Sequence, residues 1–224
     1  MNYAPAVGVK FNQDGTVRHF PGNTFICHID QSIDLIAELE WAQSQLKAMQ
    51  CAAKFSFLPI SSMHMTVFEG VCDQVRQPEK WTSKLPLDAP LAQTTDFFAS
   101  AVSQIGAHSG FEMMFDYVYN CPVGGTSIRI KPATDESDLA LKNCREQLRA
   151  STGINMPEFD DYHFHITLSY RIMELEESEK VELQQVAERI SERFSQSFGR
   201  MKHGAVEFCR FDDMFKFEPL LTLT

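Results

Sequence analysis

Two short stretches of this chain repeat one four-residue pattern that could carry chemistry. His64-Met65-Thr66-Val67 and His165-Ile166-Thr167-Leu168, here called the tetrads, each read histidine, apolar residue, threonine, apolar residue. Each tetrad lies in a segment typical of a β-strand, in which residues i and i+2 point to the same face of the sheet. Each would therefore present an imidazole beside a hydroxyl. Two tetrads facing one cleft would form a symmetric set of acid–base groups and hydroxyl donors.

This set of side chains suits the cleavage of a phosphate ester without a metal ion. An imidazole titrates at about pH 6.5, so one histidine can be neutral while the other is protonated at pH 7. The neutral histidine takes a proton from water or a hydroxyl, and the protonated one gives a proton to the leaving oxygen. The Thr66 and Thr167 hydroxyls would donate hydrogen bonds to the phosphate oxygens, where negative charge builds up. No metal or other cofactor is needed.

Strand alternation predicts further residues that contact substrate. Phe68 shares a face with the histidine and threonine of its tetrad, and its ring could stack on a nucleobase. In the second strand Arg171 lies on the tetrad face and could hold a phosphate, whereas Tyr170 is predicted to face the opposite way and to pack against a helix. Arg129 projects from a neighbouring predicted strand and is a further candidate.

His163 precedes the second tetrad by two residues and supports two other interpretations. His163-Phe164-His165 is an i, i+2 pair of the kind used by metal sites in β-sheets, although the sequence identifies no third ligand. The same stretch resembles the signature of the histidine-triad nucleotide hydrolases, but Thr167 stands where the third histidine would be. Neither interpretation explains the first tetrad. We keep His163 as a candidate substrate contact.

Composition narrows the class of partner. The 224 residues include 20 Lys and Arg against 30 Asp and Glu, for a net charge of -10, and no basic stripe is visible. Because extended nucleic acids need such a stripe, we expect a small nucleotide-like or RNA-terminal phosphate as substrate. No apolar run approaches the length that spans a membrane, and no secretory signal is visible. The six scattered cysteines favour reduced thiols and a cytoplasmic location.

The elements that must position the tetrads can be predicted from periodicity. Apolar residues at helical spacing predict helices, and short alternating runs between turn formers predict strands. The predicted helices cover residues 31–50, 91–107, 135–151 and 176–198. The predicted strands cover residues 7–11, 16–20, 23–30, 54–58, 63–69, 111–119, 126–131, 163–172, 206–211 and 214–217. We expect a long loop over residues 71–90.

The order of these elements indicates an internal duplication. A strand, a helix and a tetrad strand follow one another from Asn23, and again from Gly125. The sequence therefore predicts an α+β fold of two lobes, each an antiparallel sheet with flanking helices, around a central cleft. We expect a single bilobal domain over residues 1–224, in which the His64 lobe consists mainly of residues 23–110. The His165 lobe would consist of residues 111–200, with the C-terminal strands at 205–218 packing back.

With both tetrads, the chain resembles the 2H phosphoesterase superfamily, which is defined by two His-x-Thr/Ser motifs. The segments Gly8–Phe11, Phe20–Thr24, Met63–Gly70 and Tyr162–Leu168 resemble a bacterial branch of that superfamily. Its members include RNA 2′,5′-ligase-like proteins and 2′,3′-cyclic nucleotide phosphodiesterases.

The resemblance implies that the two histidines and two threonines of the tetrads form a catalytic quartet. It leaves open which histidine is the base and which the acid. Phe20 and its neighbours depart from the bare superfamily pattern, and we expect that segment to line the cleft and narrow the choice of substrate. A non-catalytic protein that binds a nucleotide or an RNA end, and a histidine-triad-like nucleotidyl hydrolase, remain the alternatives.

Overall fold

A computed structural model of the chain describes residues 2–30, 34–106 and 108–224. The helices are α1 (Leu35–Lys47), α2 (Leu91–Val102), α3 (Asp135–Thr152) and α4 (Glu177–Ser197). The strands are β1 (Gly22–His28), β2 (Phe55–Phe57), β3 (His64–Cys72), β4 (Glu112–Asn120), β5 (Gly125–Pro132), β6 (His165–Arg171), β7 (Arg200–Lys202), β8 (Glu207–Asp213) and β9 (Lys216–Thr222). Within these residues, no helix is long and apolar enough to cross a membrane.

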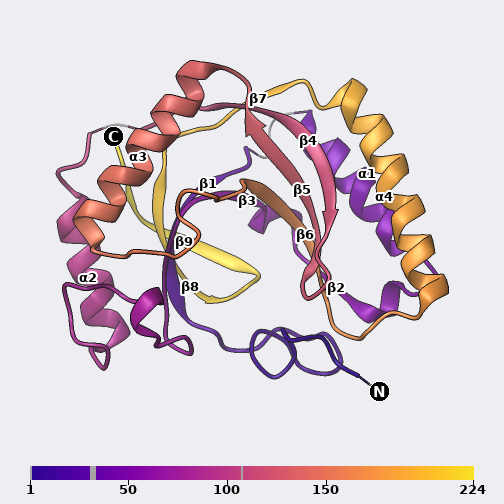
Figure 1. Cartoon of the computed structure of the whole chain (residues 1–224), viewed down its shortest axis with the longest axis horizontal. Coiled ribbons are helices and arrows are strands. Elements are labelled where there is room, and N and C mark those ends of the chain that lie inside the picture. Colours follow the sequence, from indigo (N-terminus) through magenta and orange to yellow (C-terminus); the bar gives the residue numbers. More distant parts are fainter. Residues whose placement is uncertain (1, 31–33, 107) are drawn as a thin grey trace.

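The strands form two antiparallel sheets that face each other (Figure 1). The first sheet has the order β3-β1-β8-β9 and the second the order β2-β6-β5-β4-β7. Helices α2 and α3 flank one side of the molecule, and α1 and α4 flank the other. In each sheet the tetrad strand pairs with the strand that opens its repeat, β3 with β1 and β6 with β5. The predicted two-lobed α+β architecture with one antiparallel sheet in each lobe is confirmed.

The lobes do not correspond to consecutive halves of the chain, which the boundaries 23–110 and 111–200 would require. Strand β2 belongs to the second sheet, where it pairs with β6. Helix α1 packs beside α4 on the second sheet, and Glu38 of α1 accepts two hydrogen bonds from the Arg193 guanidinium of α4. Helix α3 packs beside α2 on the first sheet, and strands β8 and β9 extend that sheet. Each lobe therefore holds elements of both repeats.

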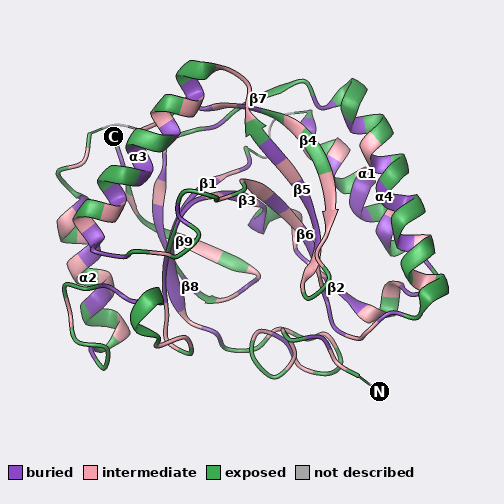
Figure 2. Cartoon of the chain, in the orientation of Figure 1, coloured by how far each residue is buried: buried purple, intermediate pink, exposed green. Residues whose placement is uncertain are grey.

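The apolar residues of the sheets and helices form the core between each sheet and its helices (Figure 2). Phe25 of β1 shows the arrangement: it is fully buried and stacks on Phe208 of β8 with ring centroids 4.7 Å apart. A second, smaller cluster lies under the N-terminal segment and includes Phe11, Phe20 and Phe211. Burying such rings contributes about 2 to 3 kcal/mol each, which fixes the rigid sheets behind the cleft.

Differences from the predicted elements lie mainly near the N-terminus. The predicted strands 7–11 and 16–20 are turns joined by isolated bridges at Phe11. The segment buries its apolar residues against Leu58, Ile172 and Phe211 instead of pairing along a sheet. The predicted helix 31–50 begins at Leu35, and its first residues, 31–33, lie outside the described part of the chain. Strand β7 was not predicted, since three residues carry too little pattern.

Candidate active site

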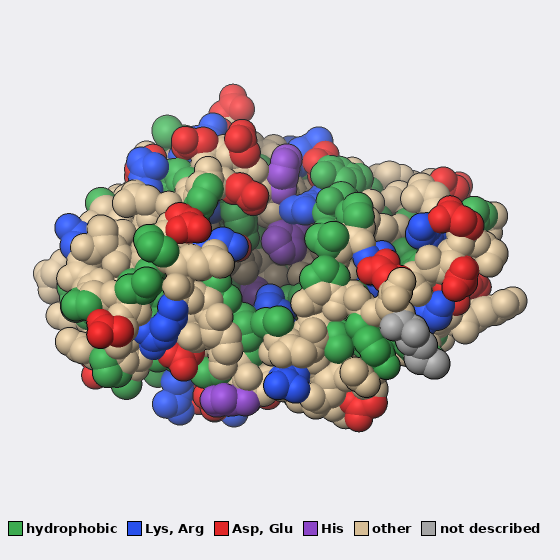
Figure 3. Space-filling view, turned by 60° about the horizontal axis from the view of Figure 1, so that its bottom comes forward, with side chains coloured by type: hydrophobic (Ala, Val, Ile, Leu, Met, Phe, Trp, Pro, Cys, Tyr) green, Lys and Arg blue, Asp and Glu red, His purple; other side chains and the backbone are tan. Residues whose placement is uncertain are grey.

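Both tetrads line one cavity between the two sheets. The cavity has a volume of about 460 Å³, and His64, Thr66, His165 and Thr167 all contribute to its wall. Figure 3 shows a hollow on this face of the molecule, with histidine and basic side chains gathered in and beside it. A cavity of this size suits a ligand as large as a nucleotide. The pairing of the tetrads across a cleft, expected from the sequence, is therefore present in the fold.

The two imidazoles are held in the same way. His64 Nδ1 lies 2.7 Å from the carbonyl oxygen of Ser62, and His165 Nδ1 lies 2.9 Å from that of His163. A carbonyl oxygen can only accept, so each Nδ1 carries the proton that it donates. In the neutral ring Nε2 is then the unprotonated nitrogen available to the cleft. Each tetrad thus presents a base whose tautomer is fixed by the backbone two residues earlier.

The surroundings keep both rings neutral in the absence of a ligand. Burial, with smaller contributions from His28 and His165, lowers the pKa of His64 to about 4. Burial also lowers the pKa of His165, and Arg129 acts in the same direction. A bound phosphate would oppose these effects, because a nearby negative charge favours the protonated imidazole. One proton can therefore enter the site together with an anionic substrate.

A β-bulge follows the threonine of each tetrad. In β3 the pairing with β1 shifts between Thr66 and Phe68, which leaves Val67 as the extra residue. In β6 the pairing with β5 shifts in the same way around Leu168. Each bulge therefore falls on the fourth residue of its tetrad. Because a bulge adds one residue to one strand, it reverses which later side chains face the cleft.

Because of this reversal, the predictions that Phe68 and Arg171 contact the substrate are wrong. Phe68 is 1% exposed and packs on the helix side of the first sheet against Phe25 and Phe159, while Glu69 lines the cavity in its place. In the second strand Tyr170 lines the cavity, contrary to the prediction that it faces a helix. Arg171 is 6% exposed, lies outside the cavity wall and donates to Glu174 at 3.4 Å.

Each bulge is held by a polar side chain from a helix of the opposite repeat. Arg145 of α3 donates to the Val67 carbonyl at 2.7 Å. Gln43 of α1 donates to the Leu168 carbonyl at 3.0 Å and to the Leu58 carbonyl at 2.7 Å. Both side chains are buried. The exchange of helices between the lobes thus places one hydrogen-bond donor behind each half of the site.

Arg129 and His163 lie behind His165 and outside the cavity wall. Arg129 Nη1 donates to the His163 carbonyl at 2.9 Å and lies 3.4 Å from His165 Nδ1, while its guanidinium stacks on the Tyr119 ring. The His163 side chain is exposed and lines a different cavity. His163 supplies the backbone carbonyl that orients His165, and Arg129 donates to that carbonyl, so the structure makes both residues positioning candidates.

Phe20 lines the cavity, as expected from the sequence, together with other residues that the sequence did not predict. The missed residues come from segments far from the tetrads, and no local spacing connects them to the site. They include Lys10, Glu69, Tyr162, Tyr170, Phe211, Met214 and Phe217. Phe217 lies edge-on to His64 with centroids 4.3 Å apart, and a hydrogen bond links the Tyr162 and Thr66 hydroxyls. Aromatic rings therefore surround the tetrads.

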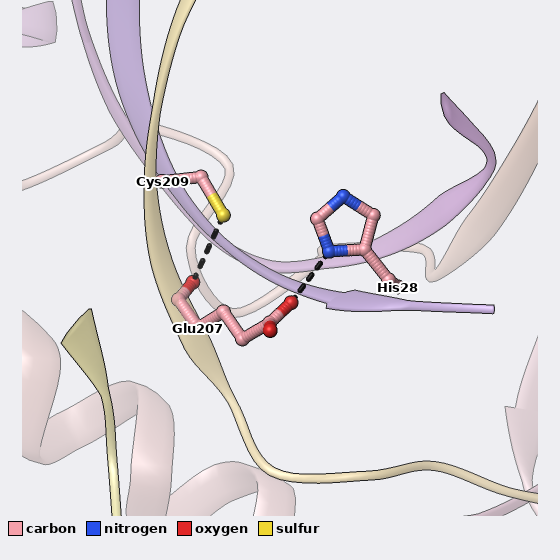
Figure 4. Close-up of side chains that lie close together, drawn as sticks. All are labelled: His28, Glu207 and Cys209. Carbon is pink, nitrogen blue, oxygen red and sulfur yellow. Dashed lines mark hydrogen bonds and ion pairs between the residues drawn. The ribbon is translucent and has the colours of Figure 1, made fainter. Parts of the chain in front are cut away.

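His28, Glu207 and Cys209 form a cluster of potential metal ligands (Figure 4). The centroid of the His28 ring lies 6.4 Å from that of the His64 ring. His28 Nδ1 is 2.5 Å from Glu207 Oε2, and the ligand atoms of His28, Glu207 and Cys209 lie within 4.8 Å of one another. Cys209 is fully buried, and burial raises the pKa of its thiol far above the ordinary range. The thiol is therefore protonated and bonds to the Glu207 carbonyl. The cluster offers a metal one imidazole, one carboxylate and one thiol, and these three residues lie outside the cavity that the tetrads line.

Comparison with known proteins relates part of the chain to a known family. A family model described as "2H-phosphodiest: Domain of unknown function (DUF1868)" matches residues 10–120, which include the first tetrad. A comparison with curated proteins gives no match.

Solved structures share the fold along the whole chain. ATU0111, a conserved protein of unknown function from Agrobacterium tumefaciens str. C58, is 29% identical with a TM-score of 0.91, covering 100% of this chain and 95% of that one. LigT of E. coli in apo form is 12% identical with a TM-score of 0.51, covering 92% and 97%. TT0787 of Thermus thermophilus is 13% identical with a TM-score of 0.51, covering 90% and 96%.

These similarities define a two-lobed protein with the LigT-like fold. In this chain, each lobe carries one His-x-Thr stretch. The chain belongs to the 2H phosphoesterase superfamily.

Proposed function

We propose that this protein is a metal-independent phosphodiesterase that opens a small cyclic or nucleotide-like phosphodiester. The observation that supports it most is the matched geometry of the tetrads: two imidazoles with the same fixed tautomer and two hydroxyls line one cavity. We propose that it acts in the cytoplasm, where its six free cysteines would stay reduced.

In the proposed reaction the phosphodiester binds between Thr66 and Thr167, whose hydroxyls donate to its non-bridging oxygens. One imidazole accepts a proton from water through Nε2 while the water oxygen bonds to phosphorus. The other imidazole, protonated when the anion binds, gives its proton to the leaving oxygen as the phosphorus–oxygen bond breaks. The product is a phosphate monoester with a free hydroxyl. Each proton transfer lowers the activation free energy of diester cleavage. The hydrogen bonds from the threonine hydroxyls to the phosphate oxygens lower it further.

Single substitutions of the histidines test this proposal. His64→Ala and His165→Ala should each lower kcat for a 2′,3′-cyclic nucleotide by at least about a thousandfold, with unchanged circular dichroism. His163→Ala is the matched control, because its side chain lies outside the cavity and its backbone carbonyl is kept. Activity that survives both tetrad changes would refute the assignment. Loss of activity in His163→Ala, together with a covalent nucleotidyl adduct trapped on His163 or His165 of the wild-type protein, would favour the histidine-triad alternative instead.

Two further measurements separate the remaining alternatives. Incubation with EDTA should leave the rate unchanged, and marked inhibition would favour a metal-dependent reaction. Tight binding of cyclic nucleotides without any product after long incubation would favour a binding protein for nucleotides or RNA ends. A panel of cyclic nucleotides and phosphorylated RNA termini would then identify the ligand.

A further inference from the structure

Lys10 brings a positive charge into the cavity from the N-terminal segment. Its Nζ lies 5.3 Å from the centroid of the Phe20 ring and 5.2 Å from that of the Tyr170 ring. All three side chains line the cavity that holds the tetrads. Cation–π contacts of this kind orient an ammonium group without using its hydrogen-bond donors. One of the three N–H donors of Lys10 bonds to the Tyr170 side chain, and the other donors can contact an anion. The rings thus hold Lys10 at a fixed place in the wall.

No carboxylate among the described residues lies within ion-pair distance of Lys10. Other half-buried lysines do have such partners, for example Lys54, whose Nζ lies 2.6 Å from Glu179. Glu69 is the acidic side chain in this cavity wall, and it acts on Lys10 at longer range. The pKa of Lys10 is raised, first by Tyr170 and against the effect of burial, so the group stays an ammonium ion. A partly desolvated cation without a counter-ion is a site for an anion.

Lys80 adds a second cation at the same end of the cavity. It also lines the wall, and both lysines lower the pKa of the Cys72 thiol, which burial raises to about 11. Two positive charges and the single carboxylate of Glu69 therefore act on one region of the cavity, which leaves an excess of positive charge there. Lys80 is exposed and long, so it can move toward a bound group, whereas Lys10 is held between its two rings.

This positive region is separate from the place where the tetrads would hold the scissile phosphate. Tyr170 follows Thr167 by three residues along β6, which corresponds to up to about 10 Å of strand. The charge of Lys10 lowers the pKa of His165, so the two groups share one electrostatic environment, yet no hydrogen bond joins them. A cavity of about 460 Å³ has room for a nucleotide that spans both places.

We propose that Lys10, supported by Lys80, binds a second phosphate group of the substrate. The substrate class is then a nucleotide that carries a phosphate monoester or a diphosphate in addition to the diester that is cleaved. The inference rests on the proposed function for the position of the scissile group. It assigns to the N-terminal segment a role in choosing among cyclic phosphates.

The test compares adenosine 2′,3′-cyclic phosphate with the same compound bearing a 5′-phosphate. The wild-type protein should prefer the 5′-phosphorylated compound in kcat/KM by about tenfold to a hundredfold, the range expected for a charge-assisted contact. Lys10→Met keeps the length and apolar contacts of the side chain and should abolish that preference, and Lys10→Arg should restore most of it. Lys84→Met, an exposed lysine outside the cavity, is the control and should keep the preference.

Two results would overturn the inference: a wild-type protein without any preference, or an equal loss on both substrates in Lys10→Met. A direct binding measurement distinguishes this failure from failure of the proposed function. Calorimetry with adenosine 2′-phosphate and adenosine 2′,5′-bisphosphate needs no turnover. The bisphosphate should bind more tightly to the wild-type protein, and Lys10→Met should bind the two about equally. If no cyclic nucleotide is hydrolysed but this difference in affinity is found, the anion site stands and the phosphodiesterase proposal fails.

Discussion

The support of the first bulge by Arg145 allows a quantitative prediction. Its two terminal nitrogens donate to the carbonyls of Val67 and Phe159 at 2.7 and 2.6 Å, and the residue is 6% exposed. Arg145→Met fills a similar volume but leaves two buried carbonyls without this donor, at a cost of about 1 to 3 kcal/mol each. Burial lowers the pKa of Arg145, so relief of the buried charge offsets part of that cost. We expect a net loss of about 2 to 4 kcal/mol.

Thermal denaturation measures this effect. For a chain of this length the loss corresponds to a fall in Tm of about 5 to 12 °C. Gln43→Met should cost less, about 1 to 2 kcal/mol, because Gln43 donates neutral hydrogen bonds and the Leu168 carbonyl keeps a bond from the Leu58 amide at 3.1 Å. Lys142→Met is the control on the same helix, since its ion pair with Asp138 is exposed and contributes little.

The same variants test whether the bulge positions the site. Well below its Tm, Arg145→Met should still fold, but its kcat/KM should fall by about tenfold to a hundredfold, because a displacement of about 1 Å is enough to misplace the Thr66 hydroxyl. If Arg145→Met melts within about 2 °C of the wild type (about 1 kcal/mol by the same scaling), or keeps full kcat/KM, the argument that α3 supports the bulge is wrong.

Three further predictions follow from the site and its surroundings. Tyr170→Ala should raise KM about tenfold by removing a stacking surface, whereas Arg171→Met should leave KM nearly unchanged; the opposite result would mean that β6 alternates without interruption. Gly125→Ala should lower both Tm and activity, because its Cβ would lie 1.7 Å from the Ser169 carbonyl oxygen and force β5 away from β6; a wild-type melting curve would contradict this contact. Burial lowers the pKa of His203 to about 4. As the pH falls, His203 therefore binds a proton in the unfolded chain before it does so in the folded protein. Stability should therefore decrease from about pH 6.5 to about pH 4 by roughly 3 kcal/mol for this group, and His203→Leu should flatten that decrease in urea titrations; an unchanged slope would show that His203 is not responsible.

The sequence alone determined the tetrads, the strand in which each lies and the α+β class. These features depend on residues close together in the chain, whose spacing and periodicity are set by the local geometry of strands and helices. The four long helices lie within a few residues of their predicted bounds for the same reason. A repeated pattern in equivalent strands was enough to predict that the tetrads share one cleft.

The tertiary structure decided which other side chains reach that cleft. A bulge is an irregularity in the pairing of two strands, so the sequence of β3 or β6 alone does not show that Glu69 and Tyr170 face the cavity instead of Phe68 and Arg171. The exchange of helices between lobes depends on which apolar faces pack best, and the place of Lys10 depends on how the N-terminal segment folds over the site. Contacts between residues far apart in the chain are fixed by packing and pairing, which no local pattern encodes.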